Sequence, residues 1–439
     1  MLRKGGFKIV LLVVCAIALC TSCARLRPAP PERPVPTVPS APPAPVGPVV
    51  SELEYKSVEE MRSKFGYIGS GSVEMSLRPR KTLAAEPTYF SRRPLYGAIE
   101  LGDSEDKRFV LVIDESKGTR SGYDTLYIDA NNNADLADDT KVAGNIRGDG
   151  SMTEFPTATV TVEIDGREYP YHITPMIYSY GDTRVNWSSA GYCEGELRFG
   201  DKTYKVALFD DTCNGVFNDA HAFPRGYPRS GSVYARGDTM VIDLDGDGEF
   251  KKSYSDTPEM YHVGRYVSFG ETCYELEIAP SGRTITVCET DSPCGYIASE
   301  QKGYSVELIG DDGALKLNGG SSRVKAPAGE YRFAACSFED KDDRGTPWRI
   351  IGQGDWSQPV VTVNPDESAS LKFGPPLTAS LTVAKSGGAF QFGLEIKGQG
   401  GETYSAGNFE RGKGRVQPPR LEIRDEKGEI VARGKFEFG

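Results

Sequence analysis

Residues 158–175 read ATVTVEIDGREYPYHITP, and this stretch indicates the fold class. Apolar and polar residues alternate on both sides of Asp165-Gly166. Alternation with a period of two is typical of a strand with one buried face, and an Asp-Gly pair between two such strands is typical of a tight turn. The stretch therefore predicts two antiparallel strands joined by a two-residue turn.

The same pattern continues further along the chain. Residues 195–210 alternate around Gly200-Asp201, which predicts a second hairpin. Residues 265–287 predict three strands, with turns at Gly270-Glu271 and Ser281-Gly282. One short helix is expected over residues 57–65, where Ser57 and Glu60 form a capping box and Gly66 ends the helix.

The composition agrees with a β-rich chain. Among 439 residues there are 50 Gly, 22 Tyr and 19 Phe, a mixture that favours strands and turns over helices. The net charge is −11, and because nucleic-acid binding needs a basic face, we expect no nucleic-acid partner. We therefore predict a mainly β fold whose N-terminal part is rich in hairpins.

A second pattern occurs three times. An apolar strand is followed by aspartate, by polar residues two and four positions later, by a small residue at the fifth and by an apolar residue at the seventh. The copies begin at Leu126 (LYIDANNNADLADD), Ala207 (ALFDDTCNGVFNDA) and Met240 (MVIDLDGDGEFKKS). Their spacing is too irregular for a solenoid. We expect one β-rich domain over about 51–298 that uses this strand-to-loop device three times.

These loops offer the oxygen donors that Ca²⁺ prefers. The candidate ligands are Asp129, Asn131, Asn133, Asp135 and Asp138 or Asp139 in the first loop, Asp210, Asn214 and Asp219 in the second, and Asp243, Asp245, Asp247 and Glu249 in the third. The alternative for each loop is a turn in which Asp and Asn side chains accept hydrogen bonds from their own backbone. We expect the third loop to bind best, the first more weakly, and the second to be such a turn.

The third loop, DLDGDGEF, resembles the D-x-D-x-D-G calcium loops of EF-hands, dockerins and many extracellular β proteins. The resemblance implies a structural Ca²⁺ that neutralises the loop and stabilises its hairpin. The sequence departs from the pattern at the twelfth position, where Tyr254 replaces the usual acidic residue, although Asp256 lies two positions further on. Because a strand rather than a helix precedes the loop, we do not expect an EF-hand proper.

From about residue 299 the sequence predicts short strands every 8 to 12 residues, which is typical of an immunoglobulin-like β-sandwich. Residues 328–333, AGEYRF, resemble the strand-and-turn signature of transthyretin-like and carboxypeptidase regulatory-like sandwiches. A final hairpin is predicted around residues 426–428. Domains of this kind serve as spacers or binding modules, an expectation that rests on fold analogy.

The N-terminus has the features of an export signal. Residues 1–23 carry Arg3, Lys4 and Lys8 before an apolar run that is too short to span a bilayer as a helix. The run ends in Cys20-Thr21-Ser22-Cys23, which resembles the lipobox of bacterial lipoproteins except that Cys20 stands where Leu is usual. The resemblance implies lipidation of Cys23 and an outer-membrane location. The alternative is an ordinary secretory leader cut after Ala24.

Residues 24–50 form a proline-rich linker. Ten of the 29 prolines lie between Pro28 and Pro48. Such a run adopts an extended polyproline II conformation and reaches roughly 65 Å at ~3.1 Å per residue. Behind a lipid anchor this linker would hold the body away from the membrane surface, and the alternative is a tail without a role.

Six cysteines follow the leader and Cys23, and their number fits an exported protein. Cys288 and Cys294 bracket the short polar stretch CETDSPC, so a local disulfide between them is the first expectation. Six free thiols are the alternative.

The sequence contains no nucleophile-elbow motif, no zinc-binding HExxH motif and no phosphate-binding loop motif. The three histidines, His172, His221 and His262, are expected to be turn or core residues in unrelated contexts. We therefore predict no catalytic residue, and a lipid-anchored envelope protein with calcium-stabilised β domains that binds a protein or polysaccharide. The alternative is a secreted glycan hydrolase on a β scaffold, with Trp187, Trp348 and Trp356 as candidates for a sugar platform.

Overall fold

The structure of the chain is a computed structural model. It describes residues 10–11, 47–58, 61–66, 69–79, 81–118, 122–148, 150–179, 182–226, 228–250, 252, 257–301, 303–319, 323–342, 344–387, 389–412 and 414–436. The predicted lipidation site Cys23, most of the proline-rich linker, and Tyr254 and Asp256 behind the third loop lie outside these residues.

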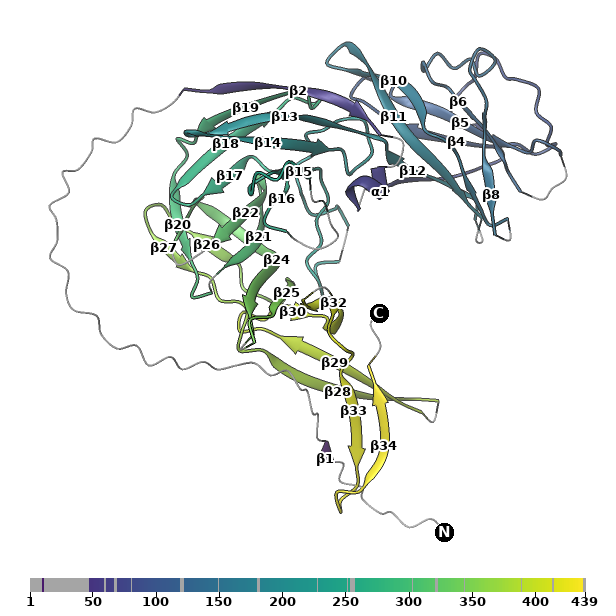
Figure 1. Ribbon diagram of the computed structural model, residues 1–439. Coiled ribbons are helices and arrows are strands. Elements are labelled where there is room, and N and C mark those ends of the chain that lie inside the picture. Colours follow the sequence, from purple (N-terminus) through teal and green to yellow (C-terminus); the bar gives the residue numbers. More distant parts are fainter. Residues whose placement is uncertain are drawn as a thin grey trace, which may run out of the picture.

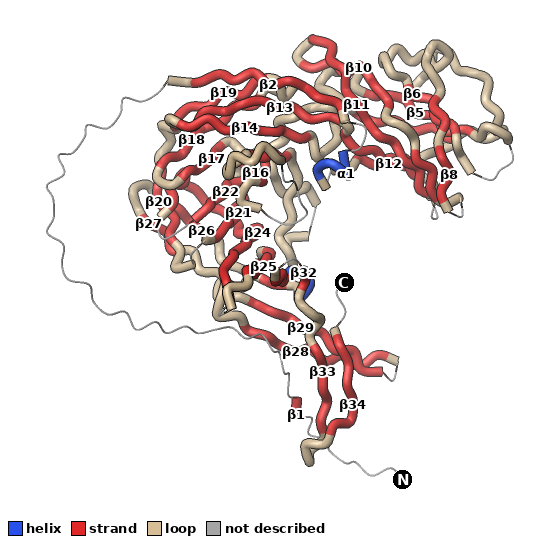
Figure 2. The backbone as a smooth tube through the Cα atoms, viewed as in Figure 1, coloured by secondary structure: helices blue, strands red, loops and turns tan. Residues whose placement is uncertain are grey.

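The fold is mainly β, as the sequence predicts. Strands make up 54% of the chain and helices 2%, and the strands form several antiparallel sheets (Figure 2). The architecture has the character of β-sandwiches. No helix within the described ranges has the length and hydrophobicity that crossing a membrane requires.

An eight-stranded sheet forms the middle of the molecule, in the order β16-β15-β14-β13-β2-β19-β18-β17 (Figure 1). Its strands are β2 (Val49–Ser57), β13 (Gly191–Phe199), β14 (Lys202–Phe209), β15 (Thr239–Ile242), β16 (Met260–His262), β17 (Tyr266–Phe269), β18 (Thr272–Ile278) and β19 (Thr284–Glu289). The first strand of the body, β2, pairs with β13 on one side and with β19 on the other. The start of the folded body therefore lies inside the sheet and not at its edge.

Two further sheets are formed by the strands between β2 and β13. A four-stranded sheet contains β4 (Leu95–Glu100), β5 (Arg108–Asp114), β6 (Thr125–Ile128) and β7 (Val142–Ala143). A six-stranded sheet contains β3 (Gly71–Glu74), β8 (Asn145–Arg147), β9 (Met152–Glu154), β10 (Ala158–Ile164), β11 (Arg167–Tyr178) and β12 (Arg184–Ser189). Both lie at one end of the arc that the molecule forms in Figure 1.

The C-terminal strands form one large and two small sheets. The ten-stranded sheet contains β21 (Tyr304–Gly310), β22 (Gly313–Gly319), β24 (Gly329–Lys341), β25 (Pro347–Gln353), β26 (Val361–Val363), β28 (Thr378–Ser386), β29 (Ala389–Lys397), β30 (Thr403–Tyr404), β31 (Phe409–Arg411) and β32 (Gly414–Arg415). The small sheets contain β20 (Cys294–Ala298), β23 (Val324–Pro327) and β27 (Ser368–Ser370), and β1 (Val10–Leu11), β33 (Arg420–Arg424) and β34 (Ile430–Lys435). A short 3₁₀ helix, η1 (Ala406–Asn408), precedes β31.

The predicted hairpin at residues 158–175 is confirmed. Strands β10 and β11 pair from Ile164 and Arg167 outward. The two turn residues, Asp165 and Gly166, have φ angles of 51° and 69°. Both angles are positive, as the type of two-residue turn that matches strand twist requires.

The turn at Gly200-Asp201 likewise joins β13 to β14, and the final predicted hairpin joins β33 to β34 around residues 426–428. The three strands expected over residues 265–287 are β17, β18 and β19.

The predicted helix is correct only at its end. Helix α1 runs over Met61–Phe65, and Gly66 follows it with a φ of +79°. The capping box is wrong, because Ser57 is the last residue of β2 and pairs with Gly191 of β13. Pairing between distant strands outweighs the local capping signal here.

The buried apolar side chains form two main clusters. The first runs from Leu53 to Val287 and joins the four-, six- and eight-stranded sheets. The second is centred on the C-terminal sheets, but it also includes Tyr266 and Cys273 from β17 and β18. Strand β20, which ends at residue 298, pairs with the downstream strands β23 and β27. Residues near the predicted boundary thus contact both parts of the body.

Candidate cation-binding loops

The three acidic loops begin in the same way. Each loop follows a strand that contributes to the first cluster of buried apolar side chains, and the aspartate directly after the strand is buried. These aspartates are Asp129 after β6, Asp210 after β14 and Asp243 after β15, with exposed fractions of 0%, 1% and 4%. A buried carboxylate requires hydrogen bonds or a counter-ion, so the surroundings of these three side chains decide what the loops can bind.

The backbone of the three loops repeats as well. In each, Oδ2 of the first aspartate accepts a hydrogen bond from the amide five residues later, at 3.0, 2.8 and 3.0 Å; the donors are Ala134, Gly215 and Gly248. The third and fifth residues after the aspartate have positive φ in every copy: Asn132 and Ala134, Cys213 and Gly215, Gly246 and Gly248. The repeat that the sequence indicates is thus a repeat of conformation too.

The first loop contains two carboxylate oxygens without partners. Oδ1 of Asp129 and Oδ2 of Asp139 are buried and accept no hydrogen bond. The other oxygens of the two groups accept from the amides of Ala134 and Ala130, at 3.0 and 3.1 Å. Burial raises the pKa of Asp129, and it raises that of Asp139 to about 6, with a further rise from the charge of Asp129. Each of the two carboxyl groups thus keeps one buried oxygen without a hydrogen-bond partner.

Three further candidate ligands of the first loop each accept one backbone hydrogen bond, whereas Asp138 accepts from the side chain of Asn133 at 2.9 Å. The acceptors are Oδ1 of Asn131 from the Asn133 amide at 3.1 Å, Oδ1 of Asn133 from the Asp135 amide at 2.7 Å, and Oδ1 of Asp135 from the Ala137 amide at 2.8 Å. An amide or carboxylate oxygen has two lone pairs, so each of these atoms keeps acceptor capacity for a cation.

The second loop is closed by hydrogen bonds. Asp210 accepts hydrogen bonds from the Asn214 amide at Oδ1 and from the Tyr171 hydroxyl and the Gly215 amide at Oδ2. The side chains of Thr212 and Asn214 in turn donate to Oδ2 of Asp219, at 2.6 and 2.7 Å. Hydroxyl and amide groups thus occupy the space between the two carboxylates, and Asp210 accepts hydrogen bonds from its own loop backbone as in the expected turn.

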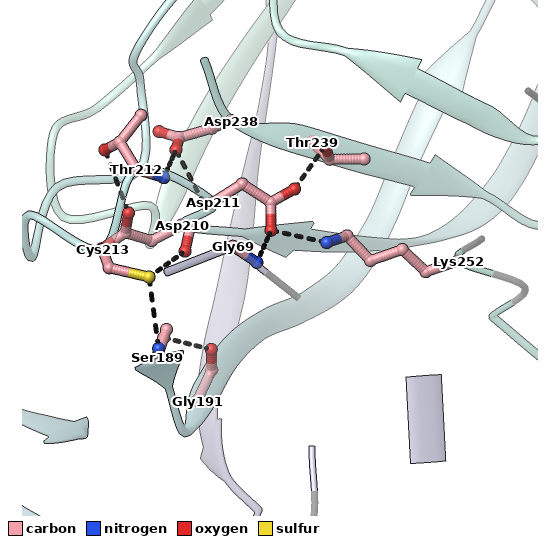
Figure 3. Close-up of polar contacts among 10 residues, drawn as sticks. All are labelled: Gly69, Ser189, Gly191, Asp210, Asp211, Thr212, Cys213, Asp238, Thr239 and Lys252. Carbon is pink, nitrogen blue, oxygen red and sulfur yellow. Dashed lines mark hydrogen bonds and ion pairs between the residues drawn. The ribbon is translucent and has the colours of Figure 1, made fainter. Parts of the chain in front are cut away.

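Figure 3 shows how this second loop is held in the core. Oδ1 of Asp238 accepts hydrogen bonds from the backbone amides of Asp211 and Thr212. Asp211 accepts from the Gly69 amide at 3.0 Å and from the hydroxyl of Thr239 at 2.6 Å, and it forms a 2.5 Å ion pair with Lys252, whose side chain is fully buried. Burial raises the pKa of Asp238 well above its usual range, and the charges of Asp210 and Asp219 raise it further.

The third loop brings its three aspartates together. One carboxylate oxygen each from Asp243, Asp245 and Asp247 lies within 4.8 Å of the others. Asp243 accepts from the Gly246 amide at 2.7 Å in addition to that of Gly248. Asp245 and Asp247 are exposed, as is Glu249, whose amide donates to Asp247 at 2.8 Å. Compared with the first loop, water has more access to these carboxylates.

The prediction that the histidines lie in unrelated contexts is wrong for two of them. The rings of His221 and His262 stack with centroids 4.0 Å apart, and both face Glu307 of β21. His172 alone has a separate environment, beside the hydroxyl of Tyr55. Glu307 is 45 residues from His262, and no local motif joins these residues, so only the pairing of strands reveals the cluster.

All six cysteines of the body are free thiols, so the expected bond between Cys288 and Cys294 is not formed. Cys288 belongs to β19, and Cys294 begins β20. The thiol of Cys294 lies within hydrogen-bonding reach of Cys273 on β18. The neighbour of Cys294 in space is thus a residue 21 positions earlier in the sequence.

The three tryptophans do not form one platform in the structure. Trp187 is buried in the first core, Trp348 packs edge-on against Phe338, and Trp356 packs against Phe223. Their contacts agree with the role of core residues.

Comparisons of this chain with protein-family models, with curated proteins and with solved structures found no match.

Proposed function

We propose that this chain is a non-enzymatic, lipid-anchored protein of the cell envelope whose β-rich body is stabilised by Ca²⁺. In this proposal Cys23 carries the lipid, the outer membrane is the location, and the body serves as a binding or structural module for a protein or polysaccharide. The anchor and the location rest on the lipobox resemblance. The calcium part rests on the geometry of the acidic loops.

The observation that carries the calcium proposal is the pair of unpartnered oxygens in the first loop, Oδ1 of Asp129 and Oδ2 of Asp139. Leaving a buried charged group without a partner costs on the order of several kcal/mol. A cation between the two carboxylates would supply that partner. Asn131 and Asn133 would add neutral oxygens, and a set of carboxylate and amide oxygens is typical of Ca²⁺ sites.

The three loops differ in how well they fit an ion. The first has buried oxygens in need of a partner, the third has three clustered carboxylates that water can reach, and the second satisfies its carboxylates internally. We therefore infer that the first loop is the strongest site and the third a weaker one. This order differs from the sequence-based expectation, which ranked the third loop highest because of its charge and its glycines.

Thermal unfolding of the purified chain in EDTA and in excess Ca²⁺ tests the proposal. A ligand that binds only the native state at 100 times its Kd stabilises it by about 2.7 kcal/mol, so we expect Ca²⁺ to raise Tm by a few degrees. Asp139→Asn should abolish most of the rise, whereas Asp182→Asn, at an exposed aspartate outside the loops, should leave it intact. An equal Ca²⁺ response in both variants would contradict the proposal.

The glycan-hydrolase alternative gains no support from the larger of two cavities in the described part of the chain. The larger has a volume of about 580 Å³ and is lined by Pro228, Ser230, Ser232, Tyr234 and Gln353, none of which is acidic. The smaller, of about 120 Å³, includes Asp311, Asp312 and Glu330 in its lining. A glycosidase needs a pair of carboxyl groups, one protonated and one ionised, on either side of the bond that it cleaves. The lining of the larger cavity offers no such pair.

A further inference from the structure

The cluster of His221, His262 and Glu307 joins segments from two different sheets. His221 lies in the connection between β14 and β15, where its amide donates to the Val263 carbonyl at 2.7 Å. His262 ends β16 of the eight-stranded sheet, and Glu307 belongs to β21 of the ten-stranded sheet. Anything that binds all three side chains would therefore connect the two sheets directly.

The backbone at Glu307 is irregular in a way that affects this side chain. The register between β21 and β24 shifts between Glu307 and Leu308. Such β-bulges redirect side chains and are frequent next to functional sites. The irregularity coincides with the residue that faces both histidines.

The donor atoms of the cluster converge. Nδ1 of His262 contacts Oε2 of Glu307, and Nδ1 of His221 lies 3.8 Å from Oε1 of the same carboxylate. One ligand atom from each residue lies within 4.8 Å of the other two. The imidazole planes differ by 9°, and each ring presents its Nδ1 to the carboxylate. The exposed fractions of the three side chains are small: 11% for His221, 22% for His262 and 5% for Glu307.

One atom of the cluster has an unmet requirement. Nδ1 of His221 is buried and has no hydrogen-bond partner, because 3.8 Å is too long for a hydrogen bond to Glu307. A buried polar atom without a partner costs about 1–3 kcal/mol.

We propose that His221, His262 and Glu307 bind one first-row transition-metal ion, with Zn²⁺ as the best match, and that this ion links the eight-stranded sheet to the ten-stranded sheet. Two imidazole nitrogens and one carboxylate oxygen form an established type of Zn²⁺ site, with ligand distances of about 2.0–2.2 Å. The ion would provide the missing partner of His221. This site is independent of the acidic loops, whose all-oxygen donors suit Ca²⁺ instead.

Lys316 is the residue opposite Glu307 in the β21–β22 ladder, and its side chain is buried as well. Burial and the nearby charge of Arg349 hold the pKa of Lys316 well below its usual range.

The test uses the full chain after chelator treatment and dialysis, with Zn²⁺ or Co²⁺ as the added ion. We expect one Zn²⁺ per chain, X-ray absorption at the zinc edge that shows only nitrogen and oxygen ligands including imidazole, and visible Co²⁺ bands that Zn²⁺ displaces. Excess Ca²⁺ should not displace the bands. No binding, or sulfur ligands from the free cysteines, would overturn the proposal, and both readouts use the unaltered chain.

Variants then assign the ligands. His221→Gln and Glu307→Gln, each checked for a native circular dichroism spectrum, should weaken Zn²⁺ binding by more than about tenfold, since even changes outside the ligand shell cost that much. His172→Gln changes the third histidine of the chain and serves as the matched control, and Asp139→Asn controls for binding at the first acidic loop. Unchanged affinity in folded His221→Gln and Glu307→Gln would overturn the assignment.

Discussion

The hydroxyl of Tyr171 donates a 2.7 Å hydrogen bond to Oδ2 of Asp210, and neither side chain has more than 1% exposure. Tyr171 comes from β11 of the six-stranded sheet, whereas Asp210 follows β14 of the eight-stranded sheet. This bond therefore helps to tie the second acidic loop to the neighbouring sheet, together with the bonds from Trp187 and Ser189 of β12 to Cys213. Burial raises the pKa of Asp210 to about 6, and the Tyr171 bond opposes that rise.

Replacing Tyr171 by Phe should therefore destabilise the fold. Hydrogen bonds to charged groups contribute about 1.5–3 kcal/mol, so we expect a loss of that size in the free energy of unfolding at pH 7.5, measured by urea titration. Tyr178→Phe, on the same strand where the side chain is only half-buried, should cost much less. Equal losses in the two variants would show that the hydrogen bond to Asp210 makes no measurable contribution to the free energy of unfolding.

The raised pKa of Asp139, about 6, gives a sign to the pH dependence of stability in EDTA. Because a carboxyl with a raised pKa keeps its proton longer in the native state than in the unfolded state, its contribution is greatest at low pH and is lost as pH rises from about 4 to about 6. Calcium requires the ionised form, so the Ca²⁺-induced rise in Tm should be larger at pH 7.5 than at pH 5. A rise of equal size at the two pH values would argue against Asp139 as a ligand.

The positive φ angles in the loops predict opposite effects for two reciprocal substitutions. Gly248 has a φ of +80°, and a side chain there would contact nothing closer than Lys205 Nζ at 3.8 Å, so Gly248→Ala adds backbone strain alone. We expect a loss of about 1–2 kcal/mol in the free energy of unfolding. Ala134 already has a φ of +65° at the equivalent position, so Ala134→Gly should be neutral or stabilising by up to about 1 kcal/mol. Denaturant titration of both variants checks the signs.

The buried ion pair between Lys252 and Asp211 predicts a third effect on stability. Lys252→Met should leave the Asp211 carboxylate in the core with only the Gly69 amide and the Thr239 hydroxyl as partners. Removing one member of a buried pair costs about 3–5 kcal/mol. The double variant Lys252→Met, Asp211→Asn should recover part of that loss, because no uncompensated charge remains. A double variant less stable than the single one would contradict this account.

Local signals predicted the local parts of the fold. The turns at Asp165-Gly166 and Gly200-Asp201 could be predicted because the turn residues and the alternation of the flanking strands are visible within a few consecutive residues. The threefold repeat of the acidic loops could be found for the same reason. The position of an aspartate directly after each buried strand fixes most of the loop geometry.

Features that depend on distant residues could not be predicted in this way. Ser57 continues a strand because Gly191 lies opposite to it, and His221 and His262 meet because β15 and β16 carry their segments to the same place. The ranking of the acidic loops also depends on burial. Charge density favoured the third loop, whereas the unpartnered oxygens of Asp129 and Asp139 become visible only once the packing around the first loop is known.

The position of β2 inside the eight-stranded sheet has a consequence for how the chain folds. Its partner on one side, β19, places Thr284 opposite Glu52, 232 residues apart in the sequence. Chain entropy opposes the closure of so long a loop, and folding rates fall as contacts become less local. The central sheet therefore closes only after residues up to about 289 are present, and until then β2 has an exposed edge. We expect slow refolding, with the hairpins of the smaller sheets protected from hydrogen exchange before β2 is.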